Sequence, residues 1–349
     1  HLGRGLFASR SPNPNPNPSP NPDHKPNRSP DPGPTRLFAT VPDEAEPEAP
    51  RELKKPNSLS PTAINDFTTC PMLFRFRYLD RRPEPVTPVL ARGNIAHDAL
   101  FEYYGLSREL RTRNNLQNLF RLSWLKAKQG KVGRNGDQYA TLFKTVEEER
   151  DWGLHGLELL ENYLELEDPT SFDPLSRELP LVYNITEDCS LHGIIDRVDV
   201  DEDGNLAVID YKTGKAPDLK YSTAMNRKIL NGRFMQLRTY ALLLAENQGR
   251  APIVLKLLYL DGPSLLWMPC NQDEVEKTRD EILKSWEAII YRVNRQHFEP
   301  TVNKLCDYCV HKSVCPAWTD GGDYDSTKKS VVLGGQDSAP RRQDSTAAS

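Results

Sequence analysis

The stretch from residue 191 to residue 212, LHGIIDRVDVDEDGNLAVIDYK, constrains the fold more than any other part of this chain. Two runs rich in Ile, Leu and Val flank an Asp-Gly-Asn sequence. That sequence is typical of a tight hairpin turn, because Gly and Asn tolerate positive φ. We therefore expect paired strands at 191–200 and 206–212. Two acids and a lysine interrupt these apolar runs, which a plain buried hairpin would not need.

The charged residues of this hairpin have the composition of a metal site. Side chains two residues apart on a strand share a face, so Asp210 and Lys212 project together, with Asp196 on the neighbouring strand. Two partly buried carboxylates repel each other, and Mg²⁺ or Mn²⁺ removes that repulsion. A lysine beside them can orient a water or stabilise charge developing on a phosphate. Each residue alone is more typical of a turn cap or an exposed ion pair, but the set favours metal-assisted phosphodiester hydrolysis.

The rest of the chain alternates helical and extended patterns. Ser60 before Pro61 marks a helix start, because serine caps a helix and proline suits its first turn. Helices first, then a mostly antiparallel sheet with one crossover helix, make the fold class α/β: a mixed central sheet flanked by helices, with a helical insertion. The insertion is expected at about 106–168, further helices at about 90–105, 228–247 and 273–295, and further strands at about 179–185, 252–260 and 264–269.

Both ends of the chain differ in composition from its middle. The chain has 29 prolines and a mean hydropathy of −0.64, and a Pro-Asn pattern without hydrophobic period fills its start. We expect a disordered arm at 1–56, a folded domain at 57–318 and a disordered tail at 319–349. Up to residue 40 the arm is poor in acids and carries arginine and serine, which resembles a transit peptide for a plastid or mitochondrion. The alternatives are a mere linker or a truncated fragment, in a nuclear or cytoplasmic protein.

The chain has 45 basic and 49 acidic residues, so its net charge gives no overall field that would attract nucleic acid. No apolar run approaches the roughly 18 to 20 residues of a membrane span, so no membrane partner is expected. A local basic groove for single-stranded nucleic acid is predicted at 70–82, CPMLFRFRYLDRR, where arginines alternate with aromatic residues. The alternative is that Phe74 and Phe76 lie in the core. A second basic stretch at 126–134 is expected to add phosphate contacts.

Three of the six cysteines, Cys306, Cys309 and Cys315, lie within ten residues and have the spacing C-x2-C-x5-C. This placement is typical of metal ligation in a reducing compartment and not of a disulfide scaffold. Zinc and iron–sulfur clusters usually take four thiolates, and Cys70 is the best fourth candidate because it and Cys315 each precede a proline. Zinc with His311 as fourth ligand, or no metal at all, are the alternatives.

The order of these motifs resembles the RecB-like branch of the PD-(D/E)XK nuclease superfamily. GIIDRVDV followed by VIDYKTG is similar to its metal-binding core. Upstream, RGNIAHDAL resembles the helix that carries a metal-ligating histidine, here His97, and RELPLVYNI resembles the strand with an acid, here Glu178. Downstream, QLRTYALLL resembles the Gln-x-x-x-Tyr helix, here Gln236 and Tyr240, which share a helix face. The resemblance covers 57–318.

This resemblance implies a restriction-endonuclease-like core and a DNA nuclease. His97, Asp196, Asp210 and the carbonyl of Tyr211 would bind Mg²⁺ or Mn²⁺, while Lys212 positions or activates the attacking water. The family further implies an exonuclease that prefers single strands, in DNA repair or recombination. The alternative is a DNA-binding scaffold with a silent nuclease centre.

The branch also implies how the cysteines are used. In AddB-type nucleases and in the CRISPR-associated and eukaryotic single-strand exonucleases, one cysteine before the nuclease motifs and three after them hold a four-iron four-sulfur cluster. Here these would be Cys70, Cys306, Cys309 and Cys315, and the cluster would staple the two ends of the domain. The chain has no helicase P-loop, so unwinding would come from a partner such as a helicase or a single-strand-binding protein.

Overall fold

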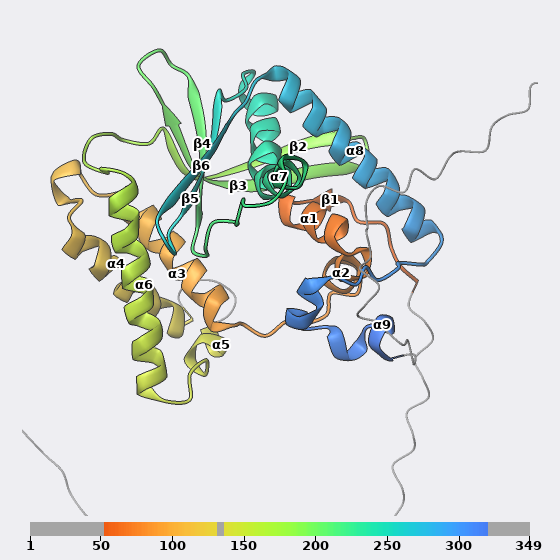
Figure 1. Ribbon diagram of the computed structural model, residues 1–349, viewed down its shortest axis with the longest axis horizontal. Coiled ribbons are helices and arrows are strands. Elements are labelled where there is room, and N and C mark those ends of the chain that lie inside the picture. Colours follow the sequence, from red (N-terminus) through yellow and green to blue (C-terminus); the bar gives the residue numbers. More distant parts are fainter. Residues whose placement is uncertain (1–51, 131–135, 320–349) are drawn as a thin grey trace, which may run out of the picture. The chain divides into compact units, whose positions relative to one another are not determined.

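The hairpin expected from the sequence forms the centre of a mixed six-stranded sheet (Figure 1). Its strands are β3 (Cys189–Val200) and β4 (Leu206–Lys212), which run antiparallel. The side chain of Asp201 fixes the turn by accepting a hydrogen bond from the backbone N–H of Asn205 at 2.7 Å. Gly204 adopts φ +81° in the same turn, a conformation that glycine takes without steric cost.

The structure is a computed structural model that describes residues 52–130 and 136–319. Nearly all of the predicted arm at 1–56, nearly all of the predicted tail at 319–349 and part of the basic stretch at 126–134 lie outside the described residues. Among the described helices, none is long and apolar enough to cross a membrane.

The other strands extend the sheet on both sides of the hairpin. The strand order is β1-β3-β4-β5-β6, and β2 pairs with the opposite edge of β3. The pairs β4–β5 and β1–β3 are parallel and the remaining pairs are antiparallel, which confirms the mixed central sheet. These strands are β1 (Ser58–Leu59), β2 (Ser176–Thr186), β5 (Val254–Tyr259) and β6 (Ser264–Pro269).

Helices cover both faces of the sheet, and each layer has its own hydrophobic core (Figure 1). On one face the core joins the strands to α1 (Pro61–Thr69), α7 (Thr223–Gln248) and α8 (Gln272–Asn294). On the other face it joins β4 and β5 to α3 (Pro88–Tyr103), α4 (Arg113–Lys128) and α6 (Val146–Leu166). The α/β class with helices on both faces is therefore confirmed.

The predicted helix starts are close to those observed. Ser60 Oγ accepts from the N–H of Ala63 at 3.1 Å, as expected for a cap. Helix α7 begins five residues before its predicted start, because Ser222 caps a polar first half that shows no hydrophobic period. The short elements are α2 (Pro71–Phe74), η1 (Arg75–Leu79), η2 (Arg108–Leu110), α5 (Gly136–Ala140), η3 (Lys304–Tyr308), η4 (Lys312–Val314) and α9 (Pro316–Thr319).

Candidate metal centre

Strands β3 and β4 separate at the two acids of the hairpin. Their last paired residues in this direction are Arg197 and Ile209, so Asp196 and Asp210 are the first residues beyond the pairing. One hydrogen bond continues across the opening, from the backbone N–H of Tyr211 to Asp196 Oδ2 at 3.0 Å. Both acids therefore lie just past the end of the backbone pairing between β3 and β4, opposite each other.

A break in the alternation of β3 directs Asp196 toward α3. Ile195 and Val198 are both fully buried in the core on the α7 side, although residues three apart should face opposite ways. Asp196 and Arg197 between them therefore both face the α3 side, although the register of β2 and β3 is the same before and after Asp196. Opposite on β2, Glu178 adopts φ +44°, which is uncommon for a residue with a side chain. This irregular pairing places the Glu178 carboxylate beside Asp196.

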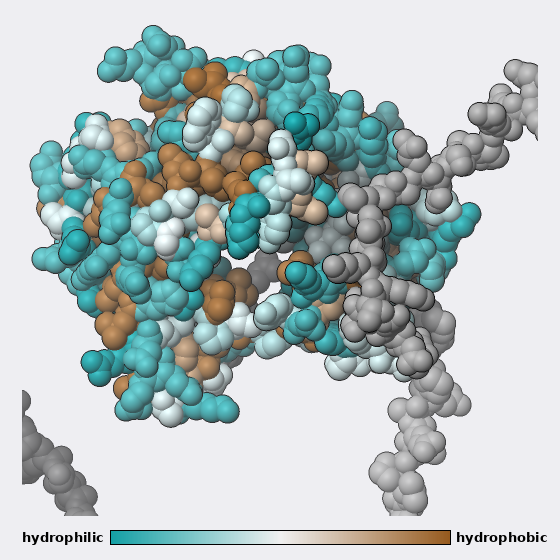
Figure 2. Space-filling view, viewed as in Figure 1, coloured by the Kyte–Doolittle hydropathy of each residue, from teal (hydrophilic) through white to brown (hydrophobic). Residues whose placement is uncertain are grey.

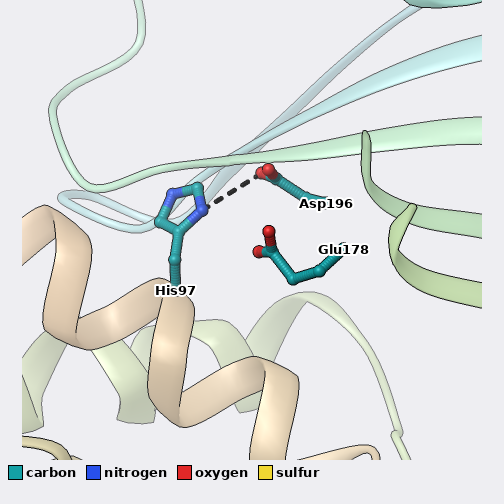
Figure 3. Close-up of side chains that lie close together, drawn as sticks. All are labelled: His97, Glu178 and Asp196. Carbon is teal, nitrogen blue, oxygen red and sulfur yellow. Dashed lines mark ion pairs between the residues drawn. The ribbon is translucent and has the colours of Figure 1, made fainter. Parts of the chain in front are cut away.

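His97 on α3, Glu178 on β2 and Asp196 on β3 point toward one another (Figure 3). One ligand atom of each lies within 4.8 Å of the other two. His97 Nδ1 lies 3.3 Å from Asp196 Oδ2, and His97 Nε2 lies 2.9 Å from the carbonyl oxygen of Tyr211. An imidazole nitrogen, two carboxylates and a carbonyl oxygen are thus gathered at one point.

Asp210 on β4 lies next to this group, opposite Asp196 where the two strands separate, but outside the three residues whose ligand atoms lie within 4.8 Å of one another. Its side chain is only 1% exposed, and neither carboxylate oxygen accepts a well-directed hydrogen bond. Lys212 Nζ lies 2.6 Å from Asp210 Oδ2 as an ion pair. A buried carboxylate without hydrogen bonds is costly, and a coordinated cation would offset that cost.

A chain of polar contacts runs from the lysine into α7. Lys212 Nζ donates to Gln236 Oε1 at 2.8 Å, and Gln236 Nε2 donates to Tyr240 Oη at 2.9 Å. The ring of Tyr240 packs on Gly193, where an added Cβ would lie 2.7 Å from a ring carbon. The two predicted helix residues are therefore held next to the predicted catalytic lysine.

The electrostatics of the site favour a cation. Burial, aided by the charge of Asp196, raises the pKa of Asp210 to about 6 and the pKa of Glu178 to about 7. Burial lowers the pKa of His97, but Asp196 outweighs it and raises that pKa to about 9. Burial tends to raise the pKa of Asp196, but the neighbouring His97 outweighs burial and holds the pKa of Asp196 below its usual value. The set therefore retains protons near neutral pH that a divalent cation can replace, and its oxygen-rich ligands suit Mg²⁺ or Mn²⁺.

Arg197 is buried beside this centre, one residue after Asp196. It is 1% exposed, and its guanidinium donates to Glu167 at 2.8 Å and to Asp199 at 3.0 Å. It also donates to the hydroxyl of Tyr211 at 2.9 Å. The acceptor Glu167, which follows the last residue of α6, was not predicted, because nothing in the local sequence connects residues thirty apart.

The predicted arginine groove at 70–82 is wrong for two of its arginines. Arg75 pairs with Asp80 at 3.2 Å, and Arg77 pairs with Asp66 at 3.0 Å and with Glu84 at 2.7 Å. The rings of Phe74 and Phe76 are buried in the core, as the alternative held. Asp80 lies within the stretch and Glu84 just after it, while Asp66 comes from α1, and the sequence pattern did not show that these acids would pair with the arginines.

The four cysteines singled out from the sequence line one cavity of about 270 Å³. All six cysteines of the chain are free thiols, and Cys189 and Cys270 lie buried elsewhere. Among the described residues, no three cysteine sulfurs lie within 4.8 Å of one another. His311 does not line the cavity; its Nε2 lies 2.8 Å from Glu84 Oε1. The structure thus gathers Cys70 with Cys306, Cys309 and Cys315 without closing them around a single ion.

Comparisons with known proteins identify the family. A family model for the PD-(D/E)XK nuclease superfamily matches residues 58–316, and no curated protein matches the chain. Among solved structures the chain is similar to a candidate exonuclease from Eubacterium rectale, with 14% identity and a TM-score of 0.41 over 73% of this chain and 88% of that one. It is also similar to SSO0001, with 15% identity and a TM-score of 0.36 over 76% and 89%. Because the family match spans the whole metal centre, the chain belongs to the PD-(D/E)XK nuclease superfamily and has its restriction-endonuclease-like fold.

Proposed function

We propose that this chain is a metal-dependent exonuclease that prefers single-stranded DNA. Membership of the superfamily makes it a nuclease, with DNA as substrate and divalent metal as cofactor. The observation that carries the proposal of an active centre is Asp210, a carboxylate 1% exposed whose one polar partner among the described residues is Lys212. A buried carboxylate beside Asp196 does not stabilise the fold by itself. A catalytic cation bound between the two carboxylates would explain why it is there.

The ligands of this centre are His97, Glu178, Asp196, Asp210 and the carbonyl oxygen of Tyr211. When bound, Mg²⁺ or Mn²⁺ neutralises the charge of the phosphate and lowers the pKa of a water. The strands β3 and β4 separate at Asp196 and Asp210, and the positive φ of Glu178 directs its carboxylate toward Asp196.

Lys212 acts on the water and on the phosphate. Its ammonium group orients the attacking water and stabilises negative charge that develops during the in-line displacement. Gln236 restrains the lysine through the 2.8 Å hydrogen bond, and Tyr240 in turn restrains Gln236. Gln236 and Tyr240 are therefore positioning residues in this proposal. The leaving deoxyribose oxygen takes its proton from solvent.

The strand preference and the cellular role rest on the sequence resemblance to the RecB-like branch. Its ordered motifs span the described domain, and the chain has no P-loop with which to unwind a duplex itself. We propose a role in DNA repair or recombination in which a helicase or a single-strand-binding protein presents the strand.

Cleavage of end-labelled DNA tests the proposal. Wild type, Lys212→Ala and the exposed control Lys284→Ala are compared with Mg²⁺ and with Mn²⁺, after purification without oxygen. Linear single strands, circular single strands and duplex are offered separately. We expect wild type and Lys284→Ala to degrade the linear single strand best, to leave the circle intact and to reveal polarity through the label. Lys212→Ala should cut nothing.

Other results would redirect the proposal. Cutting of the circle would make the chain an endonuclease, and equal cutting of duplex would remove the strand preference. Binding without any cleavage in both metals would favour the silent DNA-binding scaffold.

We further propose that Cys70, Cys306, Cys309 and Cys315 hold a four-iron four-sulfur cluster that joins the ends of the domain. Their shared cavity supports this. The distances between their sulfurs support it too, because no three of them lie within 4.8 Å of one another. Thiolates on one zinc ion lie about 2.3 Å from it and so within about 4 Å of one another, whereas a four-iron cluster is larger. Iron, sulfide and zinc analysis of anaerobically purified wild type and Cys306→Ser tests the assignment. Zinc without iron in wild type would replace the cluster.

Import into an organelle is proposed for the arm at 1–56, on its composition alone. A reporter fused to residues 1–56 should enter a plastid or mitochondrion. A reporter that stays in the cytosol would disprove this, and nuclear or cytoplasmic action would then stand.

A further inference from the structure

A second pocket lies away from the metal centre, between the first half of α7 and the edge strand β6. Its volume is about 390 Å³. Trp267 on β6 is 63% exposed beside it, and Figure 2 shows hydrophobic residues on the surface near β6. A large exposed tryptophan next to an apolar hollow is typical of a binding surface. The lining includes Arg227, Leu230, Asn231, Phe234, Trp267 and Met268.

The chain beside this pocket is strongly basic. Residues 213–234, which follow Lys212 directly, contain five lysines and arginines and a single acid, Asp218. Lys220 pairs with that acid. The other four are exposed and form no ion pair with any residue that the structure describes: Lys215, Arg227, Lys228 and Arg233. Such unpaired cations are the groups that phosphates attract.

The other long helices do not offer this combination. Helix α8 carries six acids and four bases. Helix α4 is free of acids, but two of its four bases pair with Glu149 and Glu161, and the tryptophans of the pocket beside it, Trp124 and Trp152, are buried. In a chain of net charge −4, the first half of α7 is therefore a local basic surface with an aromatic residue at its side.

This surface lies within reach of the metal centre. Arg227 precedes Gln236 by nine residues, which is about 14 Å at 1.5 Å per helical residue. Trp267 pairs with Lys256, and Lys256 pairs with Ile209, three residues before Lys212. Three residues along a strand and two strands across also give about 14 Å between Trp267 and Lys212. A DNA strand spans that distance in about four nucleotides or fewer, at 3.4 Å or more per nucleotide.

We propose that this pocket holds one nucleotide of the single-stranded substrate, with the base against Trp267 and its phosphate on Arg227. The proposal rests on the function proposed above and names a subsite for it. Stacking on an aromatic ring tolerates any base, and unpaired cations hold any phosphate, so the subsite is independent of sequence. A paired base cannot leave its duplex to enter the pocket without unstacking, so the subsite contributes to the preference for single strands.

Binding of labelled oligothymidine, measured by fluorescence anisotropy in EDTA, tests the subsite without requiring cleavage. Trp267→Ala should weaken binding by about 5- to 100-fold, and Trp267→Phe should retain most of the affinity. Arg227→Ala should reduce the slope of log affinity against log salt by about 0.7. Two controls on α8 should bind like wild type: Tyr291→Ala, which removes a 54% exposed aromatic stacked on Arg295, and Lys284→Ala.

Three outcomes would overturn the proposal. Trp267→Ala could bind the oligonucleotide as tightly as wild type. The Trp267→Ala variant could weaken binding of duplex DNA by the same factor, which would show that the pocket does not take an unpaired base. It could change the sedimenting mass of the protein alone, which would assign the pocket to a second copy of the chain. Because cleavage is not measured, the absence of nuclease activity would leave this test intact, and circular dichroism of each variant confirms that it is folded.

Discussion

Lys212 Nζ lies 2.6 Å from Asp210 Oδ2. Asp210 is only 1% exposed, and among the described residues this is the one ion pair that it makes. The pair does not fully compensate the burial, since the pKa of Asp210 rises from 3.8 to about 6. The metal-free protein therefore carries a destabilised acid at its centre.

Asp210→Asn should stabilise the metal-free protein while removing the cation site. The raised pKa of the acid means that its ionised form disfavours folding above about pH 6, and two pKa units correspond to about 3 kcal/mol. Loss of the lysine's partner reduces this gain, so we expect the free energy of unfolding in EDTA to rise by about 1 to 3 kcal/mol. Urea denaturation with and without Mn²⁺ measures both effects. Asp218→Asn, at an exposed ion pair, is the control and should change neither. A less stable Asp210→Asn protein would contradict the argument.

Gln236→Ala should slow catalysis without weakening metal binding. Gln236 accepts from Lys212 Nζ at 2.8 Å and makes no contact with the carboxylates of the centre. Misplacement of the lysine by about 1 Å is expected to lower kcat about 100-fold, with KM and Mn²⁺ affinity close to wild type. Single-turnover cleavage and calorimetric titration of Mn²⁺ separate these quantities. Gln272→Ala at the exposed start of α8 serves as control. An equal loss of metal affinity would make Gln236 part of the metal site.

Arg197→Met should destabilise the fold severely. Removing a guanidinium that is 1% exposed leaves Glu167 and Asp199 partly buried and unpaired, and breaking such a pair costs about 3 to 5 kcal/mol. Urea denaturation measures the loss. Arg250→Met removes an exposed arginine that donates to the carbonyl of Gly204 at 2.8 Å and should cost under about 0.5 kcal/mol. Similar costs for the two variants would show that the buried network contributes little.

The hairpin and the order of elements could be predicted from the sequence because they depend on local patterns. Alternating apolar residues and the Asp-Gly-Asn turn specified β3 and β4, and the strand at 264–269 has its predicted bounds. The two-residue strand β1 could not be predicted, since its pairing with β3 depends on tertiary position. The ordered motifs led to His97 and Glu178 through resemblance to a family, and the structure places both beside Asp196.

The fine geometry of the centre was not accessible from the sequence. Strict alternation along β3 would place Asp196 on the opposite face from Arg197, whereas both side chains face α3, and a positive φ at Glu178 turns its carboxylate toward Asp196. Neither Asp196 nor Glu178 is a glycine or is flanked by one, so the sequence carries no sign of irregular backbone at these two positions. Ion pairs were equally hard to predict, because Arg77 of the predicted groove pairs with Asp66 on α1 as well as with the nearby Glu84.

Glu84 makes the stability of the domain depend on pH. Glu84 Oε1 accepts from Arg77 Nε at 2.7 Å and lies 2.8 Å from His311 Nε2, which ties the segment before α3 to the cysteine loop. Burial opposes a lowered pKa, but Arg77 and His311 outweigh it and bring the pKa of Glu84 below its usual value. A depressed pKa means stabilisation that is present above the unfolded value and is lost as the pH falls through the folded value. Glu84→Gln should therefore lower the urea midpoint at about pH 7 and match wild type at about pH 3. Glu287→Gln, on the exposed side of α8, should match wild type at both. A difference for Glu84→Gln that persists in acid would show that its hydrogen bonds, and not its charge, hold the two segments together.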